Sequence, residues 1–251
     1  MGRYSGILLC SDLDGTLFNG EEIPKKNIEA IKYFAANGGM FAPASGRPIP
    51  FLRKLFDSVG YSAPVIALNG AYIYDVAKET EIKRTYMSGL ESSMILSILN
   101  AVESIERANF HTSRGHIKLL PDELRSADSS LYDEVFKVTF NLERSREKSD
   151  AAKAKIREIV PEYFEIVRSS FGCVEVVDPR NTKEKATRLV ADYVHADKLV
   201  CVGDFENDIS MVRDADIGYA VANATEELKA VADRITVSVD EGAIAAIIEE
   251  L

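Results

Sequence analysis

The sequence predicts an α/β protein with a doubly wound parallel sheet and an inserted α+β unit. Near both ends of the chain, short apolar runs alternate with amphipathic helical segments. Strands that are separated by single helices require crossover connections, which give a parallel sheet. Between residues 83 and 179 this alternation is lost. We therefore expect a core domain of residues 1–82 and 180–251, and an inserted domain of residues 83–179.

In the N-terminal part, apolar runs of strand length are followed by helical periodicity. A helix is expected after Pro24, with Ile28, Ile31 and Phe34 on one face and an end at Gly38. A second helix is expected over 51–59. Strands are expected at 7–10, 40–44 and 65–68.

The same alternation returns after the insert. In the C-terminal part, helices are expected at 186–194, from 209, at 225–232 and at 243–251, and strands at 199–202, 217–221 and 235–239. The insert itself predicts helices at 90–108 and 145–160, and strands at 136–142 and 174–177.

Composition excludes several classes of protein. The 251 residues carry 30 basic and 40 acidic side chains, a formal charge of −10, so a nucleic-acid partner is not expected. Hydrophobic residues make up 46% of the chain, an ordinary globular value. We see no signal-peptide run and no stretch of 18 apolar residues, and therefore expect no membrane segment. Three scattered cysteines favour a reducing compartment, and we expect a cytoplasmic protein, as a monomer or homodimer.

Polar clusters follow the predicted parallel strands. They are residues 11–16 (SDLDGT), 45–47 (SGR) and 203–208 (GDFEND), and Lys183 stands where the chain returns from the insert. The carboxyl ends of parallel strands share one edge of a sheet, where doubly wound folds bind ligands. We therefore expect these side chains to converge.

The expected cluster is strongly acidic. Asp12, Asp14, Asp204 and Asp208 would repel one another unless a cation lay between them. Oxygen ligands suit Mg²⁺. Ser45, the backbone amides near Gly15 and Gly46, and the charge of Lys183 would in turn attract anionic oxygens, so a phosphoryl group is the expected ligand.

These motifs, in this order, resemble the four motifs of the haloacid dehalogenase superfamily of aspartyl phosphatases. The insert resembles the class II B cap of its Cof-type branch. Residues 69–71 (NGA) and 220–233 (AVANATEELKAVAD) match further stretches of that branch, so the resemblance covers almost the whole chain. It implies a Rossmann-like core domain and a cap domain that determines substrate specificity.

The resemblance also implies roles for individual residues. Asp12 would be the nucleophile and Asp14 the general acid and base. The Mg²⁺ ligands would be Asp12, Asp14 through its carbonyl, Asp204, and Asp208 mostly through water. The residues that bind phosphate and substrate would be Ser45, Gly46, Arg47, Asn69, Lys183 and Asn207.

The residues leave some assignments open. Glu184 stands where the family usually has a small residue, and Lys185 competes with Lys183 for the phosphate. Arg47 could pair with an acidic neighbour, and Asn69 could form a left-handed turn.

The function expected is Mg²⁺-dependent hydrolysis of small phosphorylated metabolites, such as sugar phosphates, through an aspartyl-phosphate. One alternative is a phosphomutase or phosphotransferase, which returns the phosphoryl group to a second hydroxyl. A less favoured alternative is a signalling module of the receiver type, which predicts a shorter chain without an insert and a different motif order.

Overall fold

The computed structural model describes residues 2–251. The chain forms two compact units, each described by itself. Unit 1 comprises Met1–Arg84 and Thr182–Leu251, and unit 2 comprises Thr85–Asn181.

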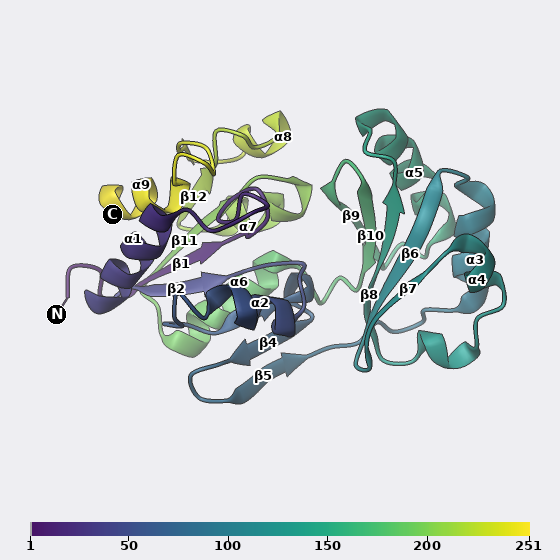
Figure 1. Ribbon diagram of the computed structural model, residues 1–251, viewed down its shortest axis with the longest axis horizontal. Helices are drawn as coiled ribbons and strands as arrows, with labels where there is room; N and C mark the ends of the chain where they lie inside the picture. The colour runs from purple at the N-terminus through teal and green to yellow at the C-terminus, as the bar shows by residue number, and fades with distance from the viewer. Residues whose placement is uncertain (1) are drawn as a thin grey trace. The chain divides into compact units, whose positions relative to one another are not determined.

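Unit 1 is built on a five-stranded parallel sheet (Figure 1). In spatial order its strands are β13 (Arg234–Ile235), β12 (Ile217–Ala220), β11 (Lys198–Gly203), β1 (Ile7–Ser11) and β2 (Met40–Pro43). The two central strands β11 and β1 are paired in register from Ile7 and Lys198 to Ser11 and Val202. Since chain segments from both ends of the sequence meet there, the centre of the sheet forms only when the two halves of unit 1 come together.

Helices connect these strands. They are α1 (Lys25–Ala36), α2 (Ile49–Phe56), α6 (Lys183–Val194), α7 (Ile209–Asp214), α8 (Glu226–Lys229) and α9 (Ala243–Glu250). Residues of α6 and α7 pack with Leu8, Cys10, Leu199 and Cys201 in one buried cluster. Outside that cluster α1 packs against α9, and the backbone N–H of Ala245 donates to the buried side chain of Asn27 at 3.0 Å. This α/β core confirms the predicted fold class.

A small antiparallel sheet replaces part of the predicted parallel one. β3 (Val65–Ala67) meets the end of β2 through a single bridge between Ala44 and Ile66, but it pairs mainly with β4 (Tyr72–Asp75), which pairs with β5 (Thr80–Arg84). The cause is the short 3₁₀ turn η1 (Leu68–Gly70), where Asn69 and Gly70 have φ of 58° and 97°. This turn reverses the chain directly after β3. The strand expected at 65–68 is therefore an edge of this second sheet.

Unit 2 has a five-stranded antiparallel sheet with helices on one face. In spatial order its strands are β7 (Gly115–Leu119), β6 (Ile105–Thr112), β8 (Val135–Leu142), β10 (Cys173–Val177) and β9 (Glu165–Ser170). The helices are α3 (Ser92–Ala101), α4 (Pro121–Arg125), η2 (Ser129–Tyr132) and α5 (Arg146–Ile159). Apolar side chains of α3 and α5 join those of β6, β8 and β10 in one core.

The helix expected at 90–108 is wrong in its second half. α3 ends at Ala101, and β6 begins at Ile105 in the middle of the sheet. Ile105, Ala108 and Phe110 all face the core. Ile105 and Ala108 are three residues apart, a spacing that also fits one face of a helix, so this pair does not distinguish the two structures. The strand expected at 235–239 is likewise short, because β13 contains only Arg234 and Ile235.

The opposite face of the unit 2 sheet is polar and holds a buried ion pair. Lys137 on β8 donates to both carboxylate oxygens of Glu175 on β10, at 2.8 and 2.9 Å, and both side chains are less than 5% exposed. Ser169 donates to the same carboxylate at 2.9 Å. Each charge therefore depends on the other, since neither is compensated by bulk water.

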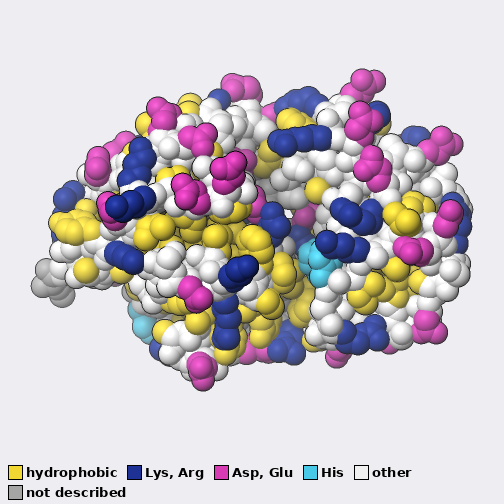
Figure 2. All heavy atoms as spheres, viewed as in Figure 1, with side chains coloured by type: hydrophobic (Ala, Val, Ile, Leu, Met, Phe, Trp, Pro, Cys, Tyr) yellow, Lys and Arg dark blue, Asp and Glu magenta, His cyan; other side chains and the backbone are white. Residues whose placement is uncertain are grey.

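Other features bear on the excluded classes of protein. Among residues 2–251, no helix has both the length and the apolar character needed to cross a membrane. On the face shown in Figure 2, basic and acidic side chains are interspersed.

The cysteines Cys10, Cys173 and Cys201 are free thiols.

We predict that Lys137→Met lowers the free energy of unfolding by about 3 kcal/mol, because it leaves the Glu175 carboxylate buried without its cation. Urea unfolding followed by circular dichroism measures the change. The matched control is Lys148→Met, which removes an exposed pair with Glu143 and should leave the free energy of unfolding nearly unchanged. Equal losses in the two variants would contradict the prediction.

Candidate active site

Strand register brings three sequence-distant segments to one edge of the unit 1 sheet. Ser11, the last residue of β1, is paired with Val202 on one side and Pro43 on the other. The next N–H, of Asp12, donates to the carbonyl of Val202 at 2.9 Å, and the N–H of Ala44 donates to the carbonyl of Ser11 at 2.8 Å. Asp12, Ser45 and Asp204 therefore follow strands that end side by side.

The loop after β1 needs a glycine. Gly15 has φ of 89°, and a Cβ there would lie 2.4 Å from Oδ2 of Asp204. The carbonyl of Gly15 accepts a hydrogen bond at 2.8 Å from the side chain of Asn223, whose own oxygen accepts from the N–H of Val239. Asn223 thus ties the loop to the C-terminal segment. Its role is that of a structural loop residue, as its place in the 220–233 stretch led us to expect.

Lys183 lies among the carboxylates. Its ammonium donates to Asp12, and to Oδ1 of Asp208 at 2.7 Å, and its side chain is fully buried. α6 begins at this residue because Thr182 caps the helix, accepting from the N–H of Lys185 at 3.3 Å. The side chain of Lys185 is exposed. Of the two lysines, the structure therefore places Lys183 in the cluster.

Asp208 also fixes the loop that carries Asp204. Its Oδ2 accepts from the backbone N–H groups of Asp204 and Phe205, at 3.1 and 3.3 Å. A side chain at position 203 would collide with Asp208, since a Cβ on Gly203 would lie 2.4 Å from that of Asp208. One carboxylate therefore connects the lysine on α6 to the turn after β11.

The local environment shifts the pKa values of these groups. Burial, followed by the charge of Asp208, raises the pKa of Asp12 to about 7 despite the opposing effect of Lys183. Burial, followed by the charges of Asp12 and Asp208, raises the pKa of Asp204 to about 9. Burial would lower the pKa of Lys183, but the two carboxylates outweigh it, and the pKa rises. The cluster is therefore short of positive charge.

The donor set fits a divalent cation. Asp12, Asp204 and Asp208 each offer a carboxylate oxygen, and these oxygens lie within 4.8 Å of one another. Three carboxylates and one ammonium leave a charge of −3 + 1 = −2 when all are ionised. An all-oxygen set of this charge suits Mg²⁺.

The Asp14 carboxylate does not join this group, contrary to the expected convergence of four carboxylates. It pairs with Arg47, whose Nε lies 3.0 Å from Oδ2 and whose Nη2 lies 2.9 Å from Oδ1. Arg47 in turn lies over the ring of Phe51, 4.7 Å from its centroid. The alternative that Arg47 pairs with an acidic neighbour is the one that the structure shows.

Three further predicted residues lie near this edge of the sheet. Ser45 is buried, and its Oγ accepts from the N–H of Arg47 at 3.1 Å. Asn69 adopts the left-handed conformation of a turn, and its N–H donates to the carbonyl of Ser45 at 3.0 Å. Asn207 is half-buried in the 3₁₀ turn η3 (Glu206–Asp208).

Comparisons with known proteins agree with this arrangement. Residues 9–248 match the family model of the haloacid dehalogenase-like hydrolases. The chain belongs to this family.

Curated relatives and solved structures carry related names. The chain is 27% identical to the 5-amino-6-(5-phospho-D-ribitylamino)uracil phosphatase YcsE of Bacillus subtilis, over 96% of this chain and 94% of the relative. It is 25% identical to phosphatase YwpJ of the same organism, over 97% and 99%. The solved structure of BT4131, a sugar phosphatase of haloacid dehalogenase subclass IIB, is similar with a TM-score of 0.81, 25% identity and coverage of 97% and 98%. The resemblance drawn from the four motifs is confirmed, and with it the predicted enzyme class, a haloacid dehalogenase-type phosphatase.

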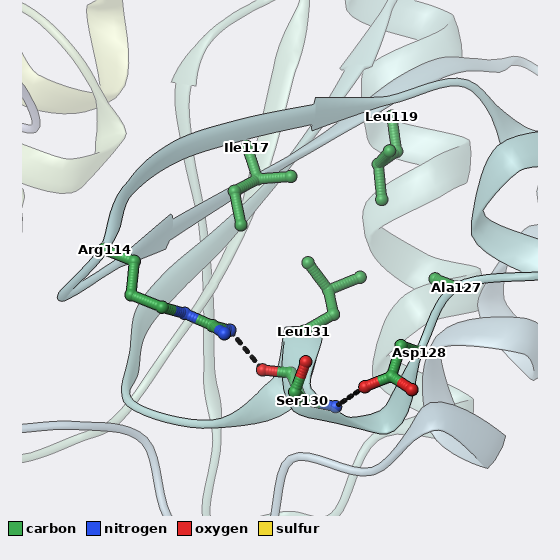
Figure 3. A pocket seen from close by; sticks show the side chains of 7 residues that line it. All are labelled: Arg114, Ile117, Leu119, Ala127, Asp128, Ser130 and Leu131. Carbon is green, nitrogen blue, oxygen red and sulfur yellow. Dashed lines mark hydrogen bonds between the residues drawn. The ribbon is translucent and has the colours of Figure 1, made fainter.

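A separate cavity of about 360 Å³ lies in unit 2 (Figure 3). Apolar side chains supply most of its lining, and none of the predicted site residues of this haloacid dehalogenase-like hydrolase takes part. Its two charged residues are both engaged with Ser130, since Arg114 donates to the carbonyl and Asp128 accepts from the N–H. The lining residues are Arg114, Ile117, Leu119, Ala127, Asp128, Ser130 and Leu131.

We predict that Asp204→Asn stabilises the metal-free protein and weakens its response to Mg²⁺. Because the fold raises the pKa of Asp204 to about 9, the unfolded chain is favoured at neutral pH, where its own carboxyl ionises freely. Replacing this carboxyl with an amide should therefore raise the free energy of unfolding in EDTA by about 1 kcal/mol or more. Added MgCl₂ should raise the melting temperature of the native chain more than that of the variant.

Thermal unfolding with and without MgCl₂ measures both effects. Asp57→Asn, at an exposed position after α2, is the matched control and should behave like the native chain. If Asp204→Asn were less stable than the native chain in EDTA, the cluster would not be short of positive charge.

Proposed function

We propose that the protein is a Mg²⁺-dependent phosphomonoester hydrolase that acts through an aspartyl-phosphate on Asp12. The observation that carries the proposal is the meeting of the Asp12, Asp204 and Asp208 carboxylates around the Lys183 ammonium at the carboxyl edge of the sheet. A carboxylate beside a cation site and a buried ammonium is an arrangement that supports phosphoryl transfer through an aspartyl-phosphate.

Two chemical steps follow from this proposal. An Asp12 carboxylate oxygen attacks phosphorus, the ester P–O bond breaks, and Asp14 gives its proton to the leaving oxygen. Asp14 then takes a proton from a water molecule that attacks the aspartyl-phosphate, and the P–O bond to Asp12 breaks. Free phosphate leaves, and both aspartates return to their starting states.

Several groups would hold the transferring phosphoryl. Lys183 supplies a positive charge, and Ser45 and Asn207 supply polar side chains near the same edge. When bound by Asp12, Asp204, the carbonyl of Asp14 and, through water, Asp208, Mg²⁺ would neutralise the charge that develops on the phosphoryl oxygens. Phosphate monoesters require accelerations up to ~10²¹-fold, at about 1.4 kcal/mol per decade, so no single contact suffices.

The proposed substrates are small phosphorylated metabolites, such as sugar phosphates. The names of YcsE and BT4131 specify a phosphoribityl compound and sugar phosphates, both small polyhydroxylated phosphate esters. We propose unit 2 as the cap domain, which selects among such substrates. We further propose a cytoplasmic enzyme, a monomer or homodimer, with no nucleic-acid or membrane partner, since a net charge of −10 disfavours polyanions.

We predict that Asp12→Asn lowers phosphate release from a panel of phosphorylated sugars and polyols by more than about 10³-fold, because the amide is a far weaker nucleophile of the same shape. EDTA should abolish turnover by the native chain, and Mg²⁺ should restore it. Asp75→Asn is the matched control, since Asp75 is also buried in unit 1 but pairs with Lys78. Undiminished turnover by Asp12→Asn would refute the nucleophile assignment.

The alternative transfer reaction has a distinct outcome. A hydrolase should release one free phosphate for each substrate consumed, without a sugar bisphosphate as activator. Phosphate release and substrate loss, measured together, give this ratio. Isomerisation of the sugar phosphate without phosphate release would favour a phosphomutase, and a stable phosphoprotein without turnover would favour the receiver-type module.

A further inference from the structure

Arg47 and Asp14 form a planar, two-point ion pair. The guanidinium presents Nε and Nη2 to the two carboxylate oxygens at 3.0 and 2.9 Å. Such a fork fixes the plane of the carboxylate as well as its position, which a point charge would not do. Both side chains are roughly half exposed, so the contribution of the pair to stability is small, and its geometric effect is the more important one.

Arg47 is itself held on several sides. Its backbone N–H donates to Oγ of Ser45 at 3.1 Å, and its carbonyl accepts from the N–H of Leu68 at 3.2 Å. Its guanidinium lies over the ring of Phe51, on the first turns of α2. The guanidinium is therefore a fixed support, anchored to the same Ser45 loop that follows β2.

Asp14 sits in a different environment from Asp12, although only one residue separates them. The Asp12 carboxylate is buried against Lys183, whereas the Asp14 carboxylate is about 43% exposed and has both oxygens on Arg47. A partly exposed carboxylate without a support would sample several rotamers. Proton transfer needs one orientation, because the donor oxygen must come within hydrogen-bond distance of the leaving oxygen.

We infer that Arg47 is a positioning residue that orients Asp14 for proton transfer and does not bind the transferring phosphoryl. This inference rests on the proposed hydrolase function. When Asp14 carries the proton, its unprotonated oxygen keeps a hydrogen bond to the guanidinium. The O–H on the other oxygen gives its proton to the leaving oxygen as the ester P–O bond breaks.

The test uses two substrates that differ in their need for a proton. A nitrophenolate leaves readily without protonation, whereas an alkoxide needs it. In single turnovers with enzyme in excess and saturating Mg²⁺, release of the leaving group reports the first step alone. Arg47→Ala should slow release of an alcohol from an alkyl phosphate by ~10²-fold, and release of nitrophenolate from 4-nitrophenyl phosphate by less than about 3-fold.

Two further variants separate orientation from charge. Arg47→Lys keeps the positive charge but not the fork, and it should resemble Arg47→Ala on the alkyl phosphate. Adding Arg47→Ala to Asp14→Asn should cause no further loss, because the group to be oriented is already absent. Arg53→Ala is the matched control and should leave both rates unchanged, since Arg53 lies on α2 with its guanidinium over the ring of Tyr74.

Each result decides the inference. Equal slowing on both substrates, or weaker inhibition by inorganic phosphate in Arg47→Ala, would show that Arg47 binds the phosphoryl group and would overturn the positioning role alone. Full activity of Arg47→Lys on the alkyl phosphate would also overturn it. If the native chain released no leaving group from either substrate, both the proposed function and this inference would be overturned. This outcome differs from the results above, which concern the Arg47 variants of an active enzyme.

Discussion

The ion cluster around Lys183 determines how the rest of unit 1 is arranged. A fully buried ammonium is tolerated only with close counter-charges, and Asp12 and Asp208 supply them from two separate strand ends. Asp208 also binds the backbone N–H groups of Asp204 and Phe205. The start of α6, the end of β1 and the turn after β11 are therefore held together by charge as well as by packing. The cluster has more carboxylates than ammonium groups, so it can also bind a cation. The same side chains therefore stabilise the fold and form the candidate metal site.

The close approach of these segments explains why glycines occur where they do. Gly15 and Gly203 each leave no room for a Cβ against an aspartate of the cluster. Gly70 likewise allows close packing against the start of α6. A Cβ there would lie 2.8 Å from the carbonyl oxygen of Thr182, the residue that caps the helix before Lys183. Small residues at these points allow the backbone to approach the carboxylates and the helix start. A side chain at Gly15 or Gly203 would displace an aspartate, and one at Gly70 would displace the start of α6.

The sequence predicts the elements that depend on the local order of residues and on where strands end. It does not predict the elements and contacts that depend on residues far away in the chain. Segments ending at Ser11 and Gly203 are apolar, of strand length and followed by aspartates, so their convergence follows from a parallel sheet. Residues 105–112 form a strand because β6 pairs with β7 on one side and with β8 on the other, and these partners lie outside the segment itself. The reversal after β3 depends on positive φ at Asn69, which the sequence permits but does not require. Likewise, nothing local indicates that Asp14 turns toward Arg47, 33 residues away.

This last difference separates the two aspartates that the motif places together. Two carboxylates that both lay against Lys183 would share one environment and compete for the same protons and cation. Arg47 holds the Asp14 carboxylate outside the cluster and partly exposed to solvent. Asp12 lies beside the ammonium, where burial and then the charge of Asp208 raise its pKa to about 7. Distinct environments allow neighbouring carboxyl groups to take distinct roles, as the proposed function requires of Asp12 as nucleophile and Asp14 as proton carrier. In this chain the division is made by a side chain from the second motif, so the first motif is complete only when the strands carrying both are paired.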